Sequence, residues 1–171
     1  MSTTDTDTLR SAPNGRAIDL SELASILDKI TIFGGLKEDQ LRHVLHHCHV
    51  RRFDRDDVIF RQGESPSDIY VTLEGRVRIV VDYEAAPMEL VEFEAGDCFG
   101  ETSAIGILPH SASAVPVEPV RLLMLPREGL LAIHREDPSL FGLLILNIAR
   151  EACRRLHHTD QTFLHYAKGR M

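Results

Sequence analysis

Near the N-terminus, apolar residues recur every three or four positions, which is the spacing of an amphipathic helix. This pattern covers residues 19–30, and Phe33-Gly34-Gly35 ends it, since glycine pairs favour turns. A second pattern of the same period predicts a short helix over residues 37–48. The apolar positions of the first helix are Leu20, Leu23, Ile26, Leu27 and Ile30.

From about residue 50 the pattern changes to short runs rich in valine, isoleucine and aromatic residues, which is typical of strands. Leu73-Glu74-Gly75-Arg76 is a candidate hairpin turn. Pro116 and Pro119 should confine their strand to an edge or a bulge, because proline lacks a backbone donor. Short strands at this spacing predict an α+β fold with a β-roll or jelly-roll barrel of about eight strands. The strands are expected at 57–63, 68–75, 76–83, 88–97, 111–118 and 120–125.

Helical spacing returns after Pro126. It predicts a short helix over residues 127–137 and a long C-terminal helix over about 139–167, which starts just after Pro138. The later part of the long helix carries a heptad-like stripe. This stripe predicts either packing on the barrel of the same chain or a homodimer formed through the helix. It consists of Ala149, Ala152, Leu156, Thr159, Phe163 and Tyr166.

Composition and charge narrow the class of protein. Of the 171 residues, 43% are hydrophobic and 26% are charged, as in soluble globular domains, and the net charge of −7 argues against a broad nucleic-acid-binding surface. No apolar run reaches the roughly 18 residues of a membrane-spanning helix, and the first residues lack a signal-peptide core. We therefore expect a disordered segment over 1–17, one domain over 18–171, a cytoplasmic location and no membrane contact. Without CxxC spacing, Cys48, Cys98 and Cys153 should be free thiols that pack as small buried hydrophobic residues.

Three stretches of sequence resemble a known family. Residues 60–64 and 68–75 read FRQGE and DIYVTLEG, residues 95–101 read AGDCFGE, and residues 102–114 have the length of a phosphate-holding loop. Set between helices in this order, they resemble the cyclic nucleotide-binding domain. That domain is the sensor of catabolite-activator-type regulators, protein kinase A regulatory subunits and nucleotide-gated channels. The resemblance covers about residues 25–165 and implies a regulatory module that binds cAMP or cGMP.

The resemblance places a phosphate-binding cassette at residues 99–112, and the chemistry of its residues is suitable. Gly100 has no Cβ, so the backbone can approach a ligand closely. Glu101 can accept a hydrogen bond from a ribose 2′-hydroxyl. Residues 102–104 should open a short helix, whose N–H groups attract anions. The expected ligand contacts in the cassette are Phe99, Gly100, Glu101, Thr102, Ser103, His110, Ser111 and Ala112.

The cassette departs from the family pattern at its charged residue. Where the family has an arginine that pairs with the phosphate oxygens, this chain has His110. Histidine with an ordinary pKa near 6.5 is mostly neutral at pH 7, whereas arginine is always charged. A hydrogen bond to a charged group contributes about 1.5–3 kcal/mol, so its loss predicts binding weaker by about ten- to hundredfold. Bound phosphate would raise the His110 pKa, and binding should then tighten as pH falls. The alternative is that His110 is an ordinary surface loop residue in a site that no longer binds.

In the family the long C-terminal helix lies over the base of the nucleotide. Alignment places Arg154, Arg155 and Thr159 there. Thr159 can hydrogen-bond a purine edge, and either arginine can stack on the base or replace the missing positive charge. The alternative is that both arginines belong to a solvated helix face.

A histidine-rich segment raises the possibility of metal chemistry. His43, His46, His47 and His49 lie beside Cys48, and the first three can share a helix face. Zinc needs further ligands that the sequence does not specify, so we expect no metal site. The HxH at 47–49 precedes the predicted strands, which argues against a metal-dependent cupin. No Ser-His-Asp or Cys-His pairing is visible, so we expect no catalysis.

Together these patterns predict a stand-alone cyclic nucleotide sensor that signals through its C-terminal helix to an unknown effector protein. Few residues follow that helix, so we expect no DNA-binding helix-turn-helix in this chain. The alternative is a degenerate, ligand-independent dimerisation or interaction module that retains only the fold. A loop 99–113 collapsed onto the base pocket would favour the alternative.

Overall fold

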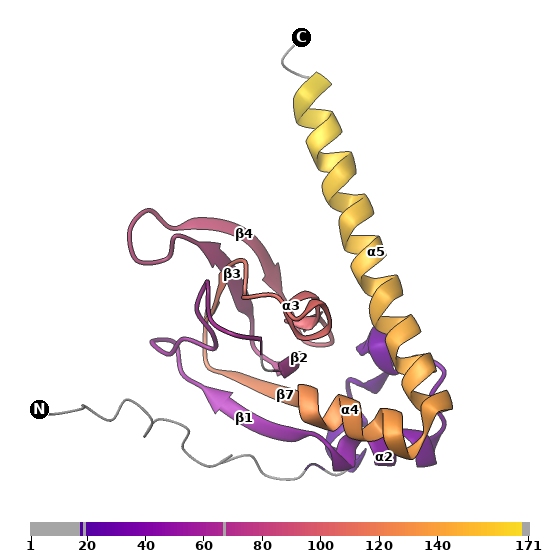
Figure 1. The fold of residues 1–171 in the computed structure, drawn as a ribbon. Helices are drawn as coiled ribbons and strands as arrows, with labels where there is room; N and C mark the ends of the chain where they lie inside the picture. The colour runs from indigo at the N-terminus through magenta and orange to yellow at the C-terminus, as the bar shows by residue number, and fades with distance from the viewer. Residues whose placement is uncertain (1–17, 19, 67, 169–171) are drawn as a thin grey trace, which may run out of the picture.

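The computed structural model describes residue 18, residues 20–66 and residues 68–168. It shows helices packed against two antiparallel sheets, with one long helix leaving the assembly towards the C-terminus (Figure 1). The disorder predicted for residues 1–17 falls outside the described residues. The division into this segment and one domain over 18–171 therefore stays a prediction.

The N-terminal part forms several short helical turns, so the single helix predicted over residues 19–30 is wrong. Ile26 has φ −126° and ψ −3°, outside the α-helical region, which ends the first turns. Separate short turns let Leu23 and Ile30 each reach the core, where both are almost fully buried. The helix predicted over 37–48 is confirmed with slightly narrower limits. The elements are α1 (Leu20–Leu23), η1 (Leu27–Lys29), η2 (Thr31–Phe33) and α2 (Glu38–His46).

The described residues contain seven strands in two sheets. One sheet has the order β1-β7-β2-β5 and the other β4-β3-β6, and all of the pairings are antiparallel. The jelly-roll class is confirmed, although the two sheets do not close into a barrel. β6 is an edge strand, as its proline predicted. The strands are β1 (His49–Phe53), β2 (Asp68–Glu74), β3 (Val77–Val81), β4 (Met88–Phe93), β5 (Cys98–Phe99), β6 (Ser113–Pro116) and β7 (Val120–Pro126).

The strand prediction misses β1 and β5, and two of its other details are wrong. Residues 57–63 form no strand and contribute only an isolated bridge from Phe60 to Ala114. The predicted hairpin at Gly75 does not exist, because β2 and β3 belong to different sheets. Gly75 has φ +79°, and a Cβ there would lie 2.6 Å from the carbonyl oxygen of Pro119. It therefore forms a tight corner at which the chain passes from one sheet to the other.

The central strands β2 and β7 bury both of their faces, and alternate residues serve two different cores. Ile69 and Val71 point to a core shared with the helices, whereas Tyr70 points to a core between the two sheets. Leu123 and Leu122 divide in the same way on β7. This follows from the two-residue period of a strand. The inter-sheet core is rich in aromatic rings and borders the candidate site described below.

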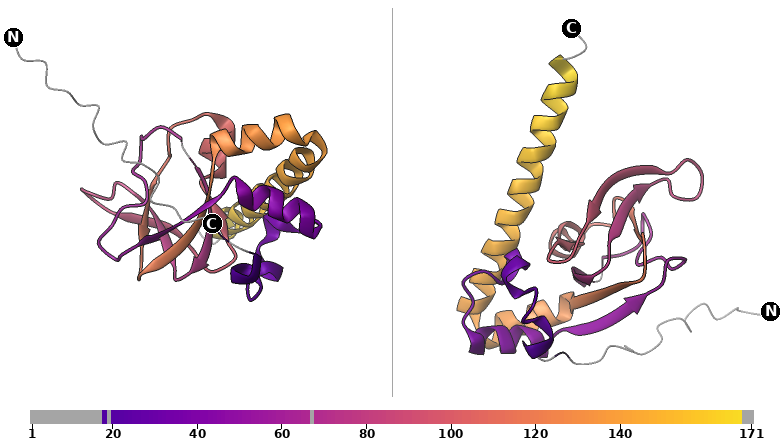
Figure 2. Two further views of the ribbon diagram at one scale, coloured as in Figure 1. Left: turned by 90° about the horizontal axis from the view of Figure 1, so that it is seen from below. Right: turned by 180° about the vertical axis from the view of Figure 1, so that it is seen from behind.

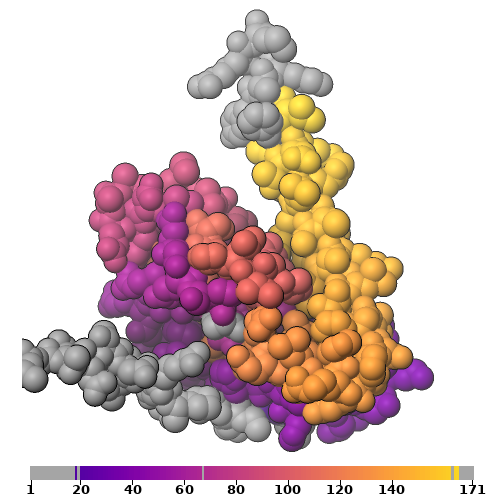
Figure 3. All heavy atoms as spheres, in the orientation of Figure 1, coloured from indigo at the N-terminus to yellow at the C-terminus, as the bar shows by residue number. Residues whose placement is uncertain are grey.

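The chain ends in α4 (Arg127–Glu136) and α5 (Pro138–Lys168), which confirms both predicted C-terminal helices. Figure 2 shows α2 and α4 at the same end of the molecule, beside the start of α5. The first half of α5 is anchored: Asn147 Nδ2 donates hydrogen bonds to the carbonyl oxygens of Ile32 and Gly34. The later described turns of α5 stand clear of the sheets (Figure 3). None of the described helices is both long and apolar enough to cross a membrane.

Candidate functional site

A cavity of about 300 Å³ lies between the inter-sheet core, the cassette and α5. Small-molecule sites in proteins start at about this size. The loop 99–113 has therefore not collapsed onto the pocket. The structure brings the predicted cassette residues, together with Arg155 and Thr159, to the wall of this cavity, although ligand contact remains a prediction for each. These residues are Phe99, Gly100, Glu101, Thr102, Ser103, His110, Ser111, Ala112, Arg155 and Thr159.

The cassette begins at Gly100, and only glycine fits there. Its φ is +80°, in the left-handed region that other residues avoid. A Cβ at this position would lie 2.8 Å from the carbonyl oxygen of Asp68 and 2.8 Å from the ring of Tyr70. Gly100 is followed by the short helix α3 (Glu101–Gly106), as predicted. The close approach of the backbone to β2 directs Glu101 into the interior.

Glu101 forms an ion pair with Arg155 across the cavity. Arg155 Nη2 donates to Glu101 Oε1, and Nη1 donates to the carbonyl oxygen of Cys98 at 2.9 Å. The guanidinium also lies 5.2 Å from the centre of the Phe93 ring, within the range of a cation–π contact. Burial raises the pKa of Glu101, and the positive charge of Arg155 opposes that rise. Arg155 thus joins α5 to the cassette and brings a permanent cation into the cavity.

His110 is buried, so the interpretation of it as an ordinary surface loop residue is wrong. Its ring stacks on Phe60, with centroids 3.8 Å apart and planes inclined by 11°. Its backbone bonds to the residues at 63 and 64, which fixes the end of the cassette against the FRQGE segment. Burial lowers the His110 pKa, although the charge of Glu64 opposes this. The ring is therefore neutral at pH 7 in the absence of an anion.

Two buried polar atoms on the cavity wall have no hydrogen-bond partner among the described residues. They are Glu101 Oε2 and His110 Nε2. Most buried polar atoms in proteins are paired, because leaving one unpaired costs about 1–3 kcal/mol. One atom is an acceptor, and the other can donate or accept depending on its proton. The cavity wall therefore offers a ligand two unpaired polar atoms, one on Glu101 and one on His110. The Arg155 side chain extends into the same cavity from α5.

The structure distinguishes the two arginines that the sequence left as alternatives. Arg154 does not line the cavity; its side chain is 61% exposed and pairs with Glu151 on the same helix. Thr159 lines the outer rim, and its hydroxyl donates to the carbonyl oxygen of Arg155 at 2.9 Å. Leu156 lies beside it and is 63% exposed. The rim that α5 contributes is therefore open to solvent.

Sequence reasoning missed the apolar wall of the cavity. Phe60, Ile79, Val91 and Phe93 line it. Ile79 and Val91 are direct partners in the β3–β4 ladder, so one face of that pair turns towards the cavity. The alternating apolar residues of the two strands carried this signal, but without the pairing register they could not be assigned to a pocket.

Two of the three cysteines have the environment of structural residues. Cys48 and Cys98 are buried, and burial raises the pKa of both thiols. Neither is therefore an activated nucleophile. Cys153 lies exposed on α5, so the expectation of three buried thiols is wrong for this residue.

Comparison with known proteins gives a family match. The family model described as "Cyclic nucleotide-binding domain" matches residues 50–137, about half of the chain. The cyclic AMP receptor protein of Thermus thermophilus is 32% identical over 130 residues, which cover 75% of this chain. The cGMP-dependent protein kinase egl-4 of Caenorhabditis elegans is 31% identical over 112 residues, which cover 64% of this chain. These matches span 58% of the receptor protein and 14% of the kinase.

A solved structure shares the fold along most of both chains. The crystal structure of a cyclic nucleotide-binding domain from Methylobacillus flagellatus superposes with a TM-score of 0.74. The superposition covers 84% of this chain and 82% of that chain, at 23% sequence identity. At this identity the likeness shows the fold and leaves the ligand open.

Proposed function

The chain belongs to the cyclic nucleotide-binding domain family, and from that premise we propose that it is a non-enzymatic regulatory module binding cAMP or cGMP. The ligand would occupy the cavity between the cassette and α5. One observation carries the proposal: unpartnered buried atoms of Glu101 and His110 face a cavity of about 300 Å³ that also holds the Arg155 guanidinium. These groups match the ribose hydroxyl and phosphate that a cyclic nucleotide presents together.

Each group has a defined task in this proposal. Glu101 Oε2 accepts a hydrogen bond from the ribose 2′-hydroxyl, and this bond is strong because the carboxylate is charged. His110 Nε2 faces the phosphate and takes up a proton as the ligand binds, because a neighbouring negative charge raises a histidine pKa. Arg155 supplies the permanent positive charge that the cassette lacks. The Phe60 ring stacked on His110 holds the imidazole in place.

Through Arg155, ligand binding can also change the position of α5. In the structure it bridges α5 to Glu101 and to β5. A ligand that recruits either member of the ion pair rearranges this contact, and α5 moves with Arg155. The later turns of α5 are the surface offered to an effector protein in the cytoplasm.

We propose further that α5 forms a homodimer. The described later part of the helix exposes Leu156 and Leu164, 63% and 54% respectively. More than half of each side chain is exposed, although Leu156 also borders the rim of the cavity, and this exposure favours self-association over packing on the chain's own sheets. Two leucines and small residues make a short seam, so the association should be weak.

One observation favours the degenerate alternative. Arg155 already satisfies one oxygen of Glu101, and His110 is neutral, so the unliganded cavity has no uncompensated positive charge. If that arrangement is final, the ion pair is a structural link and the module acts without ligand.

Thermal shift with cAMP, cGMP and a cyclic dinucleotide, with 5′-AMP as the non-cyclic control, separates the two functions. We expect cAMP or cGMP to raise the melting temperature of the wild type at pH 6. Arg155→Met should abolish that rise, whereas Arg154→Met should retain it. Absence of any shift across pH 6–8 would support the degenerate module.

A further inference from the structure

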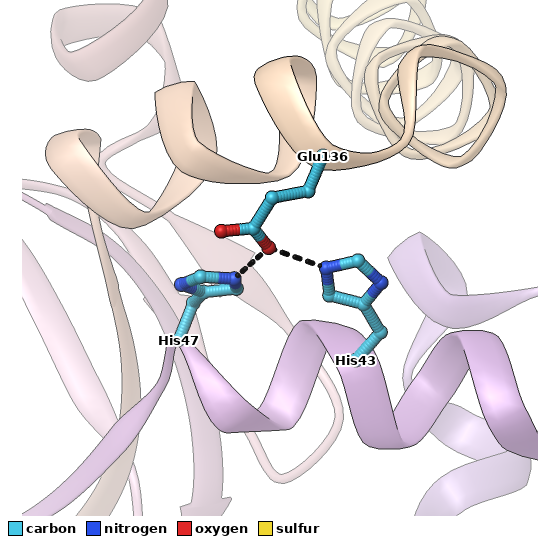
Figure 4. Close-up of side chains that lie close together, drawn as sticks. All are labelled: His43, His47 and Glu136. Carbon is cyan, nitrogen blue, oxygen red and sulfur yellow. Dashed lines mark hydrogen bonds and ion pairs between the residues drawn. The ribbon is translucent and has the colours of Figure 1, made fainter.

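Two histidines and a glutamate from distant parts of the sequence meet at the end of the molecule opposite the free turns of α5. His43 lies in the last turn of α2, His47 caps the C-terminus of that helix four residues later, and Glu136 is the last residue of α4 (Figure 4). His43 Nε2 lies 2.7 Å from Glu136 Oε2, and His47 Nε2 lies 2.9 Å from the same oxygen. One potential ligand atom from each residue lies within 4.8 Å of the others. Among the described residues, this is the group whose geometry suits a metal ion.

The backbone holds the three side chains in this arrangement. A Cβ at Gly129 would lie 3.0 Å from the carbonyl oxygen of His47, so α4 passes very close to the end of α2. Glu136 follows Gly129 by about two helical turns and therefore lies on the same face of α4. His43 and His47 share a face of α2 for the same reason. The convergence of the three groups thus results from tight helix packing.

The ligand set selects a class of ion. Two imidazole nitrogens and one carboxylate oxygen suit Zn²⁺ and similar transition ions, whereas Mg²⁺ and Ca²⁺ prefer oxygen ligands. Three protein ligands leave a fourth tetrahedral position for water. Bonds of about 2.0–2.2 Å require ligand atoms roughly 3.3 Å apart, so the groups must adjust only slightly. The side chains of His43 and Glu136 are 30% and 49% exposed, which leaves room for that adjustment.

We propose that His43, His47 and Glu136 bind one Zn²⁺ ion. The ion replaces the two hydrogen bonds to the carboxylate: each neutral imidazole binds it through Nε2 and carries its single ring proton on Nδ1. Because α5 starts at Pro138, two residues after Glu136, the ion fastens α2 to the junction of α4 and α5. Arg155 lies on α5, the helix that starts at this junction. The proposal does not depend on nucleotide binding, since the cluster is separate from the cavity.

Calorimetric titration of the metal-stripped, tag-free chain with Zn²⁺ and no nucleotide tests the site, with Co²⁺ absorption reporting tetrahedral geometry. We expect one Zn²⁺ per chain and no heat with Mg²⁺. At a hundredfold excess over the dissociation constant, Zn²⁺ should raise the melting temperature by about 5–10 °C.

Glu136→Gln and His43→Ala should each weaken Zn²⁺ binding at least about tenfold. His157→Ala is the matched control, because it removes an exposed histidine of α5 outside the cluster, and it should bind as the wild type does. Circular dichroism of the metal-free variants confirms that they fold. Equal affinity in Glu136→Gln and the wild type, or no tetrahedral Co²⁺ spectrum in the wild type, would overturn the proposal.

Discussion

Replacing Arg155 by methionine should destabilise the protein by about 2 kcal/mol. The substitution leaves the buried carboxylate of Glu101 without its cation, and breaking a buried pair costs about 3–5 kcal/mol. Two features reduce this value. The Arg155 side chain is 29% exposed, so water replaces part of the interaction, and burial already raises the pKa of Glu101, so the carboxyl can take up a proton. Methionine retains much of the apolar stem that packs along the helix.

Urea denaturation at pH 7 measures this loss, and thermal melting should show a decrease of about 4–8 °C. A double-mutant cycle with Glu101→Gln isolates the interaction between the two side chains, and we expect a coupling energy of at least about 1 kcal/mol. Arg154→Met is the matched control, because its exposed pair with a neighbouring glutamate contributes little. The cost of Arg155→Met should also be smaller at pH 5, where more of Glu101 is protonated. Additivity within about 0.5 kcal/mol at pH 7 would refute the ion pair as a structural link.

Three further outcomes follow. Gly100→Ala should cost at least about 1–2 kcal/mol, because its φ is positive, whereas Gly142→Ala on open α5 should gain about 0.5–1 kcal/mol; urea denaturation compares them. Burial lowers the folded-state pKa of His110, so the wild type should lose stability more steeply than His110→Gln as pH falls from 7 to 5; parallel curves would contradict this. Leu164→Glu should shift sedimentation towards monomer and remove any dependence of the melting temperature on protein concentration; an unchanged profile would exclude an α5 dimer.

The sequence predicted the order of elements well because most of the periodic segments kept their period in the structure; the exception is residues 19–30, which break into short turns. It failed where tertiary contacts decide. β1 carries two exposed arginines, Arg51 and Arg52, and so lacked a clear alternating pattern. Gly75 looked like a hairpin turn, but the choice between a hairpin and a corner depends on which strands pair. No local pattern specifies that choice.

The sequence identified which residues form the candidate site, but it predicted only part of their arrangement in space. The cassette residues and Arg155 do meet around one cavity. The burial of His110 could not be foreseen, because it depends on a phenylalanine fifty residues earlier that stacks on the ring. The sequence pattern also showed only part of the proposed zinc ligand set. Its histidines were visible as a cluster, but Glu136 reaches them only through the packing of α4 on α2.

Calorimetric titration of cAMP and cGMP at pH 6 and pH 8, on the wild type and on His110→Arg, tests whether His110 supplies the charge that holds the phosphate. We expect wild-type binding that tightens by about three- to tenfold at pH 6, because the complex takes up a proton at His110. The pH dependence should vanish in His110→Arg, whose charge is permanent. Binding in the arginine variant alone, with no heat from the wild type at either pH, would show that His110 does not support binding and that the cavity keeps its shape without its ligand.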